Sequence, residues 1–322
     1  MSIQLSADQA FELIYGVAPS PQEKLRLHEL LGGRDVRDLS AMRQIIMGHD
    51  RQSRPTPATV RFGPGDVRWL ELEGFRLALD SADPSVSMAI LAQGGWEPHL
   101  TGVFRRYLRP GMRVVDVGAN VGYYTMLAAT LAGADGAVMA FEPNSENCRL
   151  ILMSVAANQF VNVRLFPLAL AEAPGYEHFS MHIGSNGGFV SASHALAAGH
   201  GTIVPTARLD DLVQPPVDFV KMDVEGAEYR VVCGARALIE AAQPIVSTEF
   251  SCEMITRVSR TTPHDFLAFF LSYGYSILMI DRRSGYLQAV PDIDAFLRAW
   301  GDPVRIEDLL MLPHGARVSQ PV

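Results

Sequence analysis

The sequence of 322 residues has little cysteine and little charge. Its three cysteines, Cys148, Cys233 and Cys252, are odd in number and far apart, which excludes a disulfide framework or zinc knuckle and fits a reducing compartment. Only 19% of the residues are charged, and 27 Lys and Arg against 35 Asp and Glu give a net charge of −8. Such a chain has no general basic character for nucleic acid or an anionic membrane, so we predict neither as a partner.

Long hydrophobic runs are also missing. The longest weakly polar stretch, Val121 to Ala134, ends at Asp135 and is shorter than the ~20 residues that span a bilayer. The first residues carry neither a basic segment nor a small-residue cleavage site, so they do not resemble a secretory signal. We therefore predict a cytoplasmic protein without a membrane span. Because 48% of the residues are hydrophobic, the length suffices for one large α/β domain and a small extra module.

The chain divides into three parts by its local signals. Helix starts and glycine stops predict three short helices in residues 1–58, a helical module that we consider as a homodimer contact or an adaptor. Residues 59–109 are predicted as a lead-in with helical segments and a hairpin, Val60 to Leu79, around Gly63-Pro64-Gly65 and Glu73-Gly74. Residues 110–322 are predicted as a Rossmann-like domain.

This last part alternates short β-branched runs with helical stretches. The alternation predicts a mostly parallel, doubly wound α/β sheet, in which ligands bind beyond the carboxyl ends of the strands. The expected strands are Arg113 to Val117, Ala137 to Phe141, Val163 to Leu168, Phe219 to Met222, Ile245 to Glu249 and Ser276 to Ile280.

A glycine-containing turn follows the first of these strands. Gly118 and Gly122 lack a Cβ, so the backbone can turn sharply and a ligand can approach it closely. Asp116, in the last turn of the strand, can accept hydrogen bonds from loop amides or from a ligand ammonium. The helix that begins near Val121 offers free N–H groups to a carboxylate. The turn therefore suits a zwitterion.

The spacing of the glycines indicates which kind of cofactor the turn can bind. A dinucleotide turn has G-x-G-x-x-G, whereas this one has G-x-x-x-G, and the sequence contains no Walker motif. Glu142 follows the second strand, where an acid can hold a ribose diol. S-adenosylmethionine (SAM) is a cofactor that contains both a ribose and an amino acid, so it fits these features. The predicted cofactor-binding residues are Asp116, Gly118, Asn120, Gly122, Tyr123, Tyr124, Glu142, Asn144 and Ala169.

These residues resemble the FkbM family of SAM-dependent O-methyltransferases, over about residues 80 to 282. The resemblance implies a class I methyltransferase fold and transfer to hydroxyls of sugars, polyketides and similar natural products. It is most specific in Lys-x-Asp-x-Glu-Gly-x-Glu, which starts at Lys221. Ala171-Glu172 departs from the family, where a shorter Asp is usual. The matching segments are Gly95 to Pro98, Pro110-Gly111, Asp116 to Thr125, Phe141 to Pro143, Thr206 with Leu209 to Asp211, Asp218 to Glu228, and Pro244 followed by Glu249.

Carboxylates gather after the fourth and fifth strands. Asp223, Glu225 and Glu228 lie within six residues, where they repel one another unless they meet cations, donors or a substrate. A helix N-terminus explains Glu228 and part of Glu225, but not Asp223. We expect Asp223 to act as a base, or with Glu225 or Glu249 as a ligand of a divalent cation such as Mg²⁺, and the sequence leaves this choice open. Lys221 is a catalytic candidate or a partner for an acid.

Residues Ser185 to Ser191 are predicted as a loop near the same edge, either a plain β-turn at Asn186-Gly187 or a substrate-side loop. Asn and Ser side chains suit sugar hydroxyls, and the family resemblance places such a segment over the pocket. The predicted substrate residues are Trp96, Glu97, His182, Asn186 and Ser191.

Three other functions compete with this one. An amino-methylating nucleic-acid enzyme needs a [DNS]-P-P-[YFW] clamp after the fourth strand, where this chain has Asp223 to Gly226, and Gln214 to Val217 only imitates it on the preceding loop. A nicotinamide oxidoreductase lacks support because the third glycine is missing. A binding or adaptor protein that keeps the fold without turnover, with residues 1–58 as its functional part, remains an alternative.

Overall fold

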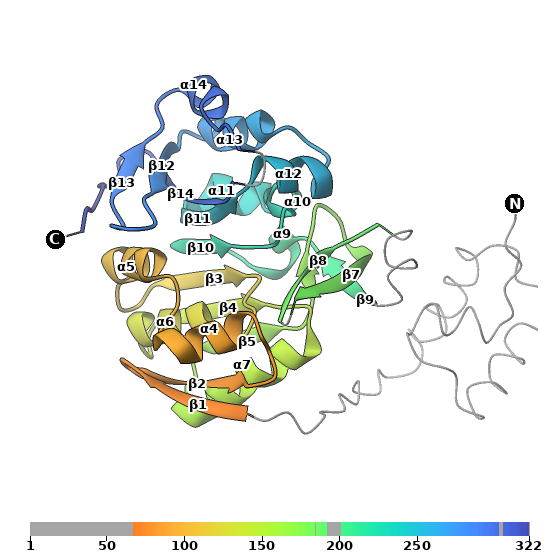
Figure 1. Ribbon diagram of the computed structural model, residues 1–322. Coiled ribbons are helices and arrows are strands. Elements are labelled where there is room, and N and C mark those ends of the chain that lie inside the picture. The colour runs from red at the N-terminus through yellow and green to blue at the C-terminus, as the bar shows by residue number, and fades with distance from the viewer. Residues whose placement is uncertain (1–66, 184, 192–200, 303–304, 322) are drawn as a thin grey trace, which may run out of the picture. The chain divides into compact units, whose positions relative to one another are not determined.

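The computed structural model describes residues 67–183, 185–191, 201–302 and 305–321 (Figure 1). The helical module predicted for residues 1–58 and the Gly63-Pro64-Gly65 turn lie outside the described residues. The hairpin turn at Glu73-Gly74 is present, and it joins two antiparallel strands, β1 (Val67–Leu72) and β2 (Phe75–Asp80).

The central element is a sheet whose described strands run in the order β13-β12-β14-β11-β10-β3-β4-β5. The five strands from β11 to β5 are mutually parallel, and β14 runs antiparallel between β11 and β12. The strands are β3 (Arg113–Val117), β4 (Ala137–Phe141), β5 (Val163–Phe166), β10 (Phe219–Met222), β11 (Ile245–Phe250), β12 (Ser276–Ile280), β13 (Leu287–Ala289) and β14 (Glu307–Leu312).

The mostly parallel doubly wound sheet is thus confirmed. Four of the predicted strands, β3, β4, β10 and β12, have the predicted bounds, because strands buried on both faces give short continuous apolar runs. β11 extends one residue further, to Phe250. The prediction of one strand from Val163 to Leu168 is too long, since β5 ends at Phe166 and the chain then enters a different sheet.

Helices cover both faces of the sheet, and alternate residues of β3 point to opposite sides. Val114 packs into a core under α4 to α7, whereas Val115 packs into a core under α9 to α14. The helices on the first face are α4 (Val86–Gln93), α5 (Pro98–Tyr107), α6 (Tyr123–Ala132) and α7 (Ser145–Asn158). Those on the second are α9 (Leu209–Leu212), α10 (Glu228–Cys233), α11 (Arg236–Ala242), α12 (Cys252–Val258), α13 (Pro263–Ser272) and α14 (Ile293–Arg298).

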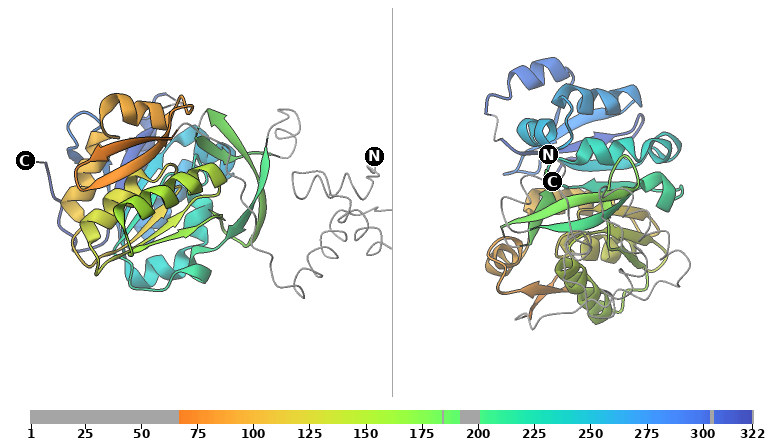
Figure 2. Two further views of the ribbon diagram at one scale, coloured as in Figure 1. Left: turned by 90° about the horizontal axis from the view of Figure 1, so that it is seen from below. Right: turned by 90° about the vertical axis from the view of Figure 1, so that its right-hand side faces the viewer.

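A second, smaller sheet stands beside the carboxyl edge of the first (Figures 1 and 2). Its described strands are β6 (Ala169–Leu170), β7 (Gly175–Ile183), β8 (Asn186–Phe189) and β9 (Thr202–Ala207), in the order β6-β9-β7-β8. The expectation of a loop over Ser185 to Ser191 is therefore wrong for its central part. Asn186 to Phe189 form β8, because they pair antiparallel with β7.

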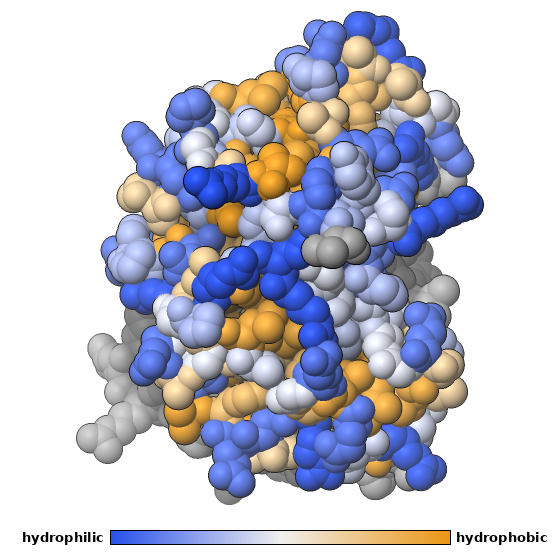
Figure 3. All heavy atoms as spheres, turned by 90° about the vertical axis from the view of Figure 1, so that its left-hand side faces the viewer, coloured by the Kyte–Doolittle hydropathy of each residue, from blue (hydrophilic) through white to orange (hydrophobic). Residues whose placement is uncertain are grey.

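Hydrophobic side chains do not form one broad surface on the side away from this smaller sheet. Figure 3 shows that side, where apolar areas are interrupted by hydrophilic residues. Among the described residues, large exposed hydrophobic side chains are spread over distant elements, as with Trp69 on β1 and Leu271 on α13. No helix in the described ranges is long and apolar enough to cross a membrane.

Candidate active site

A cavity of about 610 Å³, which includes space open to solvent, lies where β3, β4 and β10 end and the small sheet begins. Its walls combine apolar side chains with a few polar groups, as is usual for small-molecule sites. Phe141, Leu168 and Phe179 are among the apolar ones, and sequence reasoning did not single them out. The predicted residues that line the cavity are Gly118, Asn120, Glu142, Ala169, Asn186, Asp223 and Glu225.

The glycines of the first turn are required by close packing. Gly118 has φ +74°, and a Cβ there would overlap the backbone carbonyl oxygen of Asp223. Gly122, with φ +91°, would place a Cβ 2.8 Å from Cγ1 of Ile151 on α7. The bare backbone therefore lets the ends of β3 and β10 approach each other and keeps α7 against the turn.

Asp116 lies behind the cavity wall and does not line it. It is fully buried, and its Oδ2 accepts a hydrogen bond of 2.6 Å from the Thr125 hydroxyl. Its Oδ1 accepts no hydrogen bond from the described residues and lies 3.8 Å from Lys221 Nζ. Burial raises the pKa of Asp116, and Lys221 opposes this rise. Its predicted contact with a ligand ammonium stays a prediction.

Lys221 joins the turn to the reactive end of the site. Its Nζ donates to the Gly118 carbonyl oxygen at 3.0 Å and to Asp223 Oδ2 at 3.3 Å. Burial lowers its pKa, but the negative charges of Asp223 and Asp116 outweigh that effect, so the pKa is raised overall. Lys221 is therefore a buried cation that orients Asp223. The structure thus places it as a partner for acids.

Glu142 directly follows β4, and main-chain amides hold both of its carboxylate oxygens. Its carboxylate accepts hydrogen bonds from the N–H of Asn120 at 2.8 Å and of Asn144 at 2.9 Å. Burial raises its pKa to about 7, although these two bonds and the amide of Asn147 lower it. Asn144 itself caps α7, since its side chain accepts from the Glu146 N–H. Glu142 is therefore fixed in place on the cavity wall.

Asn120 connects the two sheets across this cavity. Its side-chain amide donates to Asn186 Oδ1 at 2.8 Å, and its backbone is left-handed, with φ +51°. Asn186, predicted on the substrate side, thus contacts the turn from β8. Ser191 is exposed and lines a neighbouring groove instead. The side chain of His182 lies outside the described residues.

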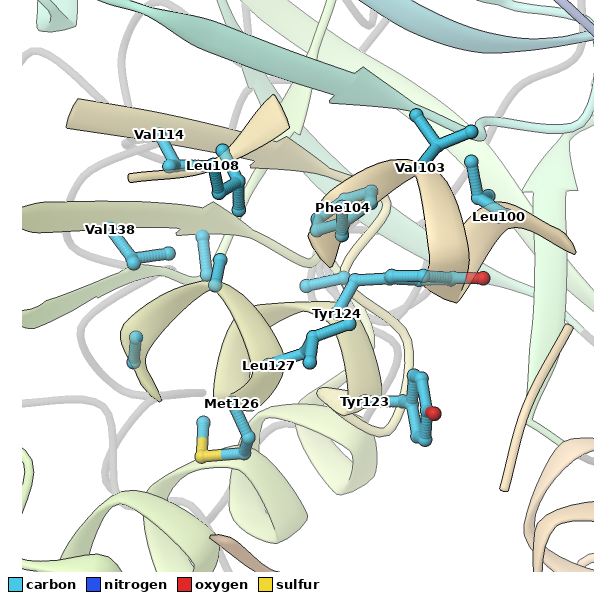
Figure 4. Close-up of a cluster of buried hydrophobic side chains, with 14 of the residues drawn as sticks. Leu100, Val103, Phe104, Leu108, Val114, Tyr123, Tyr124, Met126, Leu127 and Val138 are labelled. Atoms are coloured by element: carbon cyan, nitrogen blue, oxygen red, sulfur yellow. The ribbon is translucent and has the colours of Figure 1, made fainter. Parts of the chain in front are cut away.

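Tyr123 and Tyr124 lie in the core on the first face of the sheet (Figure 4). They are 7% and 4% exposed, and neither lines the cavity. The Tyr124 hydroxyl donates to Glu97 Oε2 at 2.8 Å, and Lys221 Nζ lies 5.3 Å from the Tyr124 ring centroid. Tyr124 therefore connects the predicted residues Glu97 and Lys221 to the core.

Glu97 precedes α5 with a left-handed backbone, φ 38°. Burial raises its pKa to about 7, with further contributions from Asp308 and Asp223, so it lies near both acids. Trp96 is partly buried, and its carbonyl oxygen accepts a bond from Thr101. His99 Nε2 lies 2.8 Å from Asp308 Oδ2, a buried pair that sequence reasoning missed because 209 residues separate them.

The remaining acids surround Asp223, whose side chain is 37% exposed. Burial and Asp223 raise the pKa of Glu225 to about 7, and burial with several acids raises that of Glu249. Glu228 is buried and accepts bonds from the N–H groups of Val224 and Gly226, as a helix N-terminus predicts. Within the described residues, no group of three or more His, Cys, Asp or Glu is arranged to hold a metal ion.

The cavity fits the parts of SAM. Apolar rings and aliphatic side chains can enclose a flat base, and Glu142 can accept hydrogen bonds from ribose hydroxyls. Together with the sheet of parallel strands, these features define a class I SAM-dependent methyltransferase fold.

The sequence matches one known protein family. Residues 116–277 match the methyltransferase FkbM domain, and the chain belongs to that family. SAM is accordingly its cofactor. No curated protein matched the sequence.

Several solved structures are similar. The FkbM methyltransferase from Methylobacillus flagellatus is 18% identical, with 66% of this chain and 50% of that one covered and a TM-score of 0.40. This chain thus spans half of that protein's length. A SAM-dependent methyltransferase from Aquifex aeolicus is 13% identical, with 66% of this chain and 88% of that one covered and a TM-score of 0.37. M. jannaschii TYW2 in complex with AdoMet is 14% identical, with 79% of this chain and 88% of that one covered and a TM-score of 0.42.

Proposed function

We propose that the protein methylates a hydroxyl group of a sugar, a glycan, or a glycosylated or polyketide natural product. One observation carries this proposal. Asp223 directly follows β10 on the wall of the cofactor cavity, partly exposed, with Lys221 Nζ 3.3 Å from its Oδ2. A carboxylate so placed can take the proton of an acceptor hydroxyl, which is a weak nucleophile.

The residues have separate roles in this proposal. When bound, SAM supplies a methyl group on a cationic sulfur. Asp223 receives the proton that the acceptor oxygen loses, and Lys221 orients Asp223. Glu142 holds the ribose, and much of the rate enhancement comes from positioning the two bound reactants. Gly122, Asn144, Ala169, Tyr123 and Tyr124 stay proposed as cofactor residues, directly or by shaping the cavity.

The role of Asp223 as a ligand of Mg²⁺ with Glu225 or Glu249 stays open in the proposal. Oxygen ligands of this type suit Mg²⁺. The two roles predict different responses to a chelator: activity that EDTA abolishes and Mg²⁺ restores supports the ligand role, whereas activity that is insensitive to EDTA supports the base.

The proposal includes a cytoplasmic location, which the three free cysteines support. It places residues 1–58 as a homodimer contact, and it excludes nucleic acid as the acceptor because the chain is acidic.

The test has two stages. Purified protein should bind S-adenosylhomocysteine (SAH) in calorimetry, and binding should weaken in Glu142→Gln. Tritiated methyl transfer is then measured on a panel of sugar, glycan and macrolide acceptors. A protein that binds no SAH overturns the proposal, and one that binds SAH but methylates only amines overturns the O-specificity.

A further inference from the structure

A second, larger groove lies next to the cofactor cavity, and the proposed function does not use it. Its volume is about 1770 Å³ including space open to solvent. We call it the α12 groove. Its walls come from β7 and β8, from α10 and from the end of α12; they include Glu177, Phe189, Tyr229, Arg230, Arg257 and Arg260.

The groove is continuous with the proposed reaction centre. Phe189 and Glu225 line both the groove and the cofactor cavity. Glu225 is two residues from Asp223, and the two acids are close enough for Asp223 to raise the pKa of Glu225. A molecule bound in the α12 groove can therefore extend one of its hydroxyls to Asp223 without leaving the groove.

One wall of the groove is neutralised and rigid. Arg230 pairs with Glu172 at 2.7 Å and also with Glu177, and its guanidinium lies 4.9 Å from the Phe189 ring centroid. The positive charge of Arg230 is thus already neutralised by two carboxylates. This wall can offer hydrogen bonds and an aromatic surface, but it does not attract an anion.

The α12 side of the groove carries positive charge. Arg257 lies in the last turn of α12, and its side chain is 62% exposed. Its ion pair with Glu253 is 3.5 Å long, a surface pair of little stability, and its charge also lowers the pKa of Glu225. Arg260 is exposed, and its side chain makes no ion pair or hydrogen bond with the described residues. Two available arginines on one wall therefore contrast with the net charge of −8 of the whole chain.

We propose that the α12 groove is the acceptor site and that the acceptor is an anionic carbohydrate, whose phosphate or carboxylate binds Arg257 and Arg260. This inference rests on the proposed function. Guanidinium groups bind both anions through paired N–H groups. Tyr229, partly exposed, lines the groove and offers an aromatic surface to the sugar.

Calorimetry on the full chain with saturating SAH tests the proposal. The probes are hexagalacturonate for carboxylate, glucose 1-phosphate for phosphate, and neutral maltohexaose. We expect an anionic probe to bind more tightly than maltohexaose, with an affinity that falls as salt rises. The double variant Arg257→Ala/Arg260→Ala should weaken that probe by about tenfold or more and leave SAH affinity unchanged.

Arg298→Ala is the matched control, because Arg298 is also an exposed arginine in the last turn of a helix, and it should change nothing. Which anionic probe binds decides between carboxylate and phosphate. Failure of both anionic probes, equal binding of maltohexaose, or unchanged affinity in the double variant overturns the anionic acceptor. If the wild-type chain binds no SAH, the proposed function itself fails, so the two failures are distinguishable.

Discussion

Glu142 and Asp223 directly follow the two strands that flank β3, yet their surroundings differ. Glu142 is 4% exposed and held by neutral main-chain amides, whereas the Asp223 side chain is 37% exposed and held by a buried lysine. A carboxylate with fixed donors keeps one geometry, which suits holding a ligand. A carboxylate at the open side, next to a cation, can reach a reacting group. Position on the sheet edge alone does not define a role.

Gly118 directly follows β3, which lies between β4 and β10 in the sheet. Of the substitutions considered, one at Gly118 should have the largest effect on stability and on SAH binding. Gly118→Ala combines a positive φ with overlap against the Asp223 carbonyl, so we expect the free energy of unfolding to fall by at least about 3 kcal/mol and SAH binding to be lost. Urea unfolding measures this. Gly94→Ala is the control, because Gly94 has an ordinary left-handed backbone, φ 68° and ψ 26°, with no atom within 4 Å of a Cβ, and it should cost only about 1 kcal/mol. Equal costs would contradict the close approach of β3 and β10.

Asp223→Asn tests the reactive end. It should lower turnover by on the order of 10²-fold and change SAH affinity by less than about threefold, because the side chain keeps its shape but loses its basic oxygen. Methyl transfer and calorimetry measure the two effects. Asp135→Asn, an exposed site before β4 at the opposite edge, should affect neither. Unchanged turnover in Asp223→Asn would remove Asp223 from the reaction.

Glu142→Gln tests the holding end. SAH affinity should fall about tenfold, since charge-assisted bonds to ribose hydroxyls are replaced by weaker ones. Turnover at saturating SAM should stay near that of the wild type. Glu146→Gln, four residues along in the first turn of α7, is the matched control. The reverse result, normal affinity with low turnover, would exchange the roles of Glu142 and Asp223.

The smallest effect is a pH dependence. Because burial raises the pKa of Glu142 to about 7, its carboxylate gains a proton as pH falls below that value and accepts fewer hydrogen bonds. SAH affinity should therefore fall about fivefold between pH 8 and pH 6, and Glu142→Gln should flatten the profile. A profile that Glu142→Gln leaves unchanged assigns the titration to another group.

The contribution of Glu142 to the free energy of unfolding should change with pH in the opposite direction to SAH affinity. A raised pKa means that the folded chain holds this proton more tightly than the unfolded chain, so the contribution of Glu142 to stability is full below its ordinary pKa of 4.5 and is lost as pH rises through about 7. The difference between wild type and Glu142→Gln in urea unfolding at pH 5 and pH 8 isolates this contribution.

Much of the main sheet could be predicted from the sequence, because β3, β4, β10 and β12 are short apolar runs between helical stretches. The small sheet could not. β8 contains Asn186-Gly187-Gly188, residues that favour turns, and only pairing with β7 makes them a strand. Likewise Leu168 to Leu170 look like a continuation of β5, although Ala169 pairs with Thr206 in the other sheet.

Local periodicity specifies where each strand ends, so the glycines and carboxylates that follow successive strands could be found in the sequence. Which carboxylate faces the cavity depends on how the strands pair in the folded chain. In the parallel pairing of β3 with β10, Lys221 lies beside Asp116, so these opposite charges stay together behind the wall. Asp223, two residues further, lies beyond that pairing and faces the cavity. Register and burial depend on contacts between segments a hundred residues apart, which no local pattern contains.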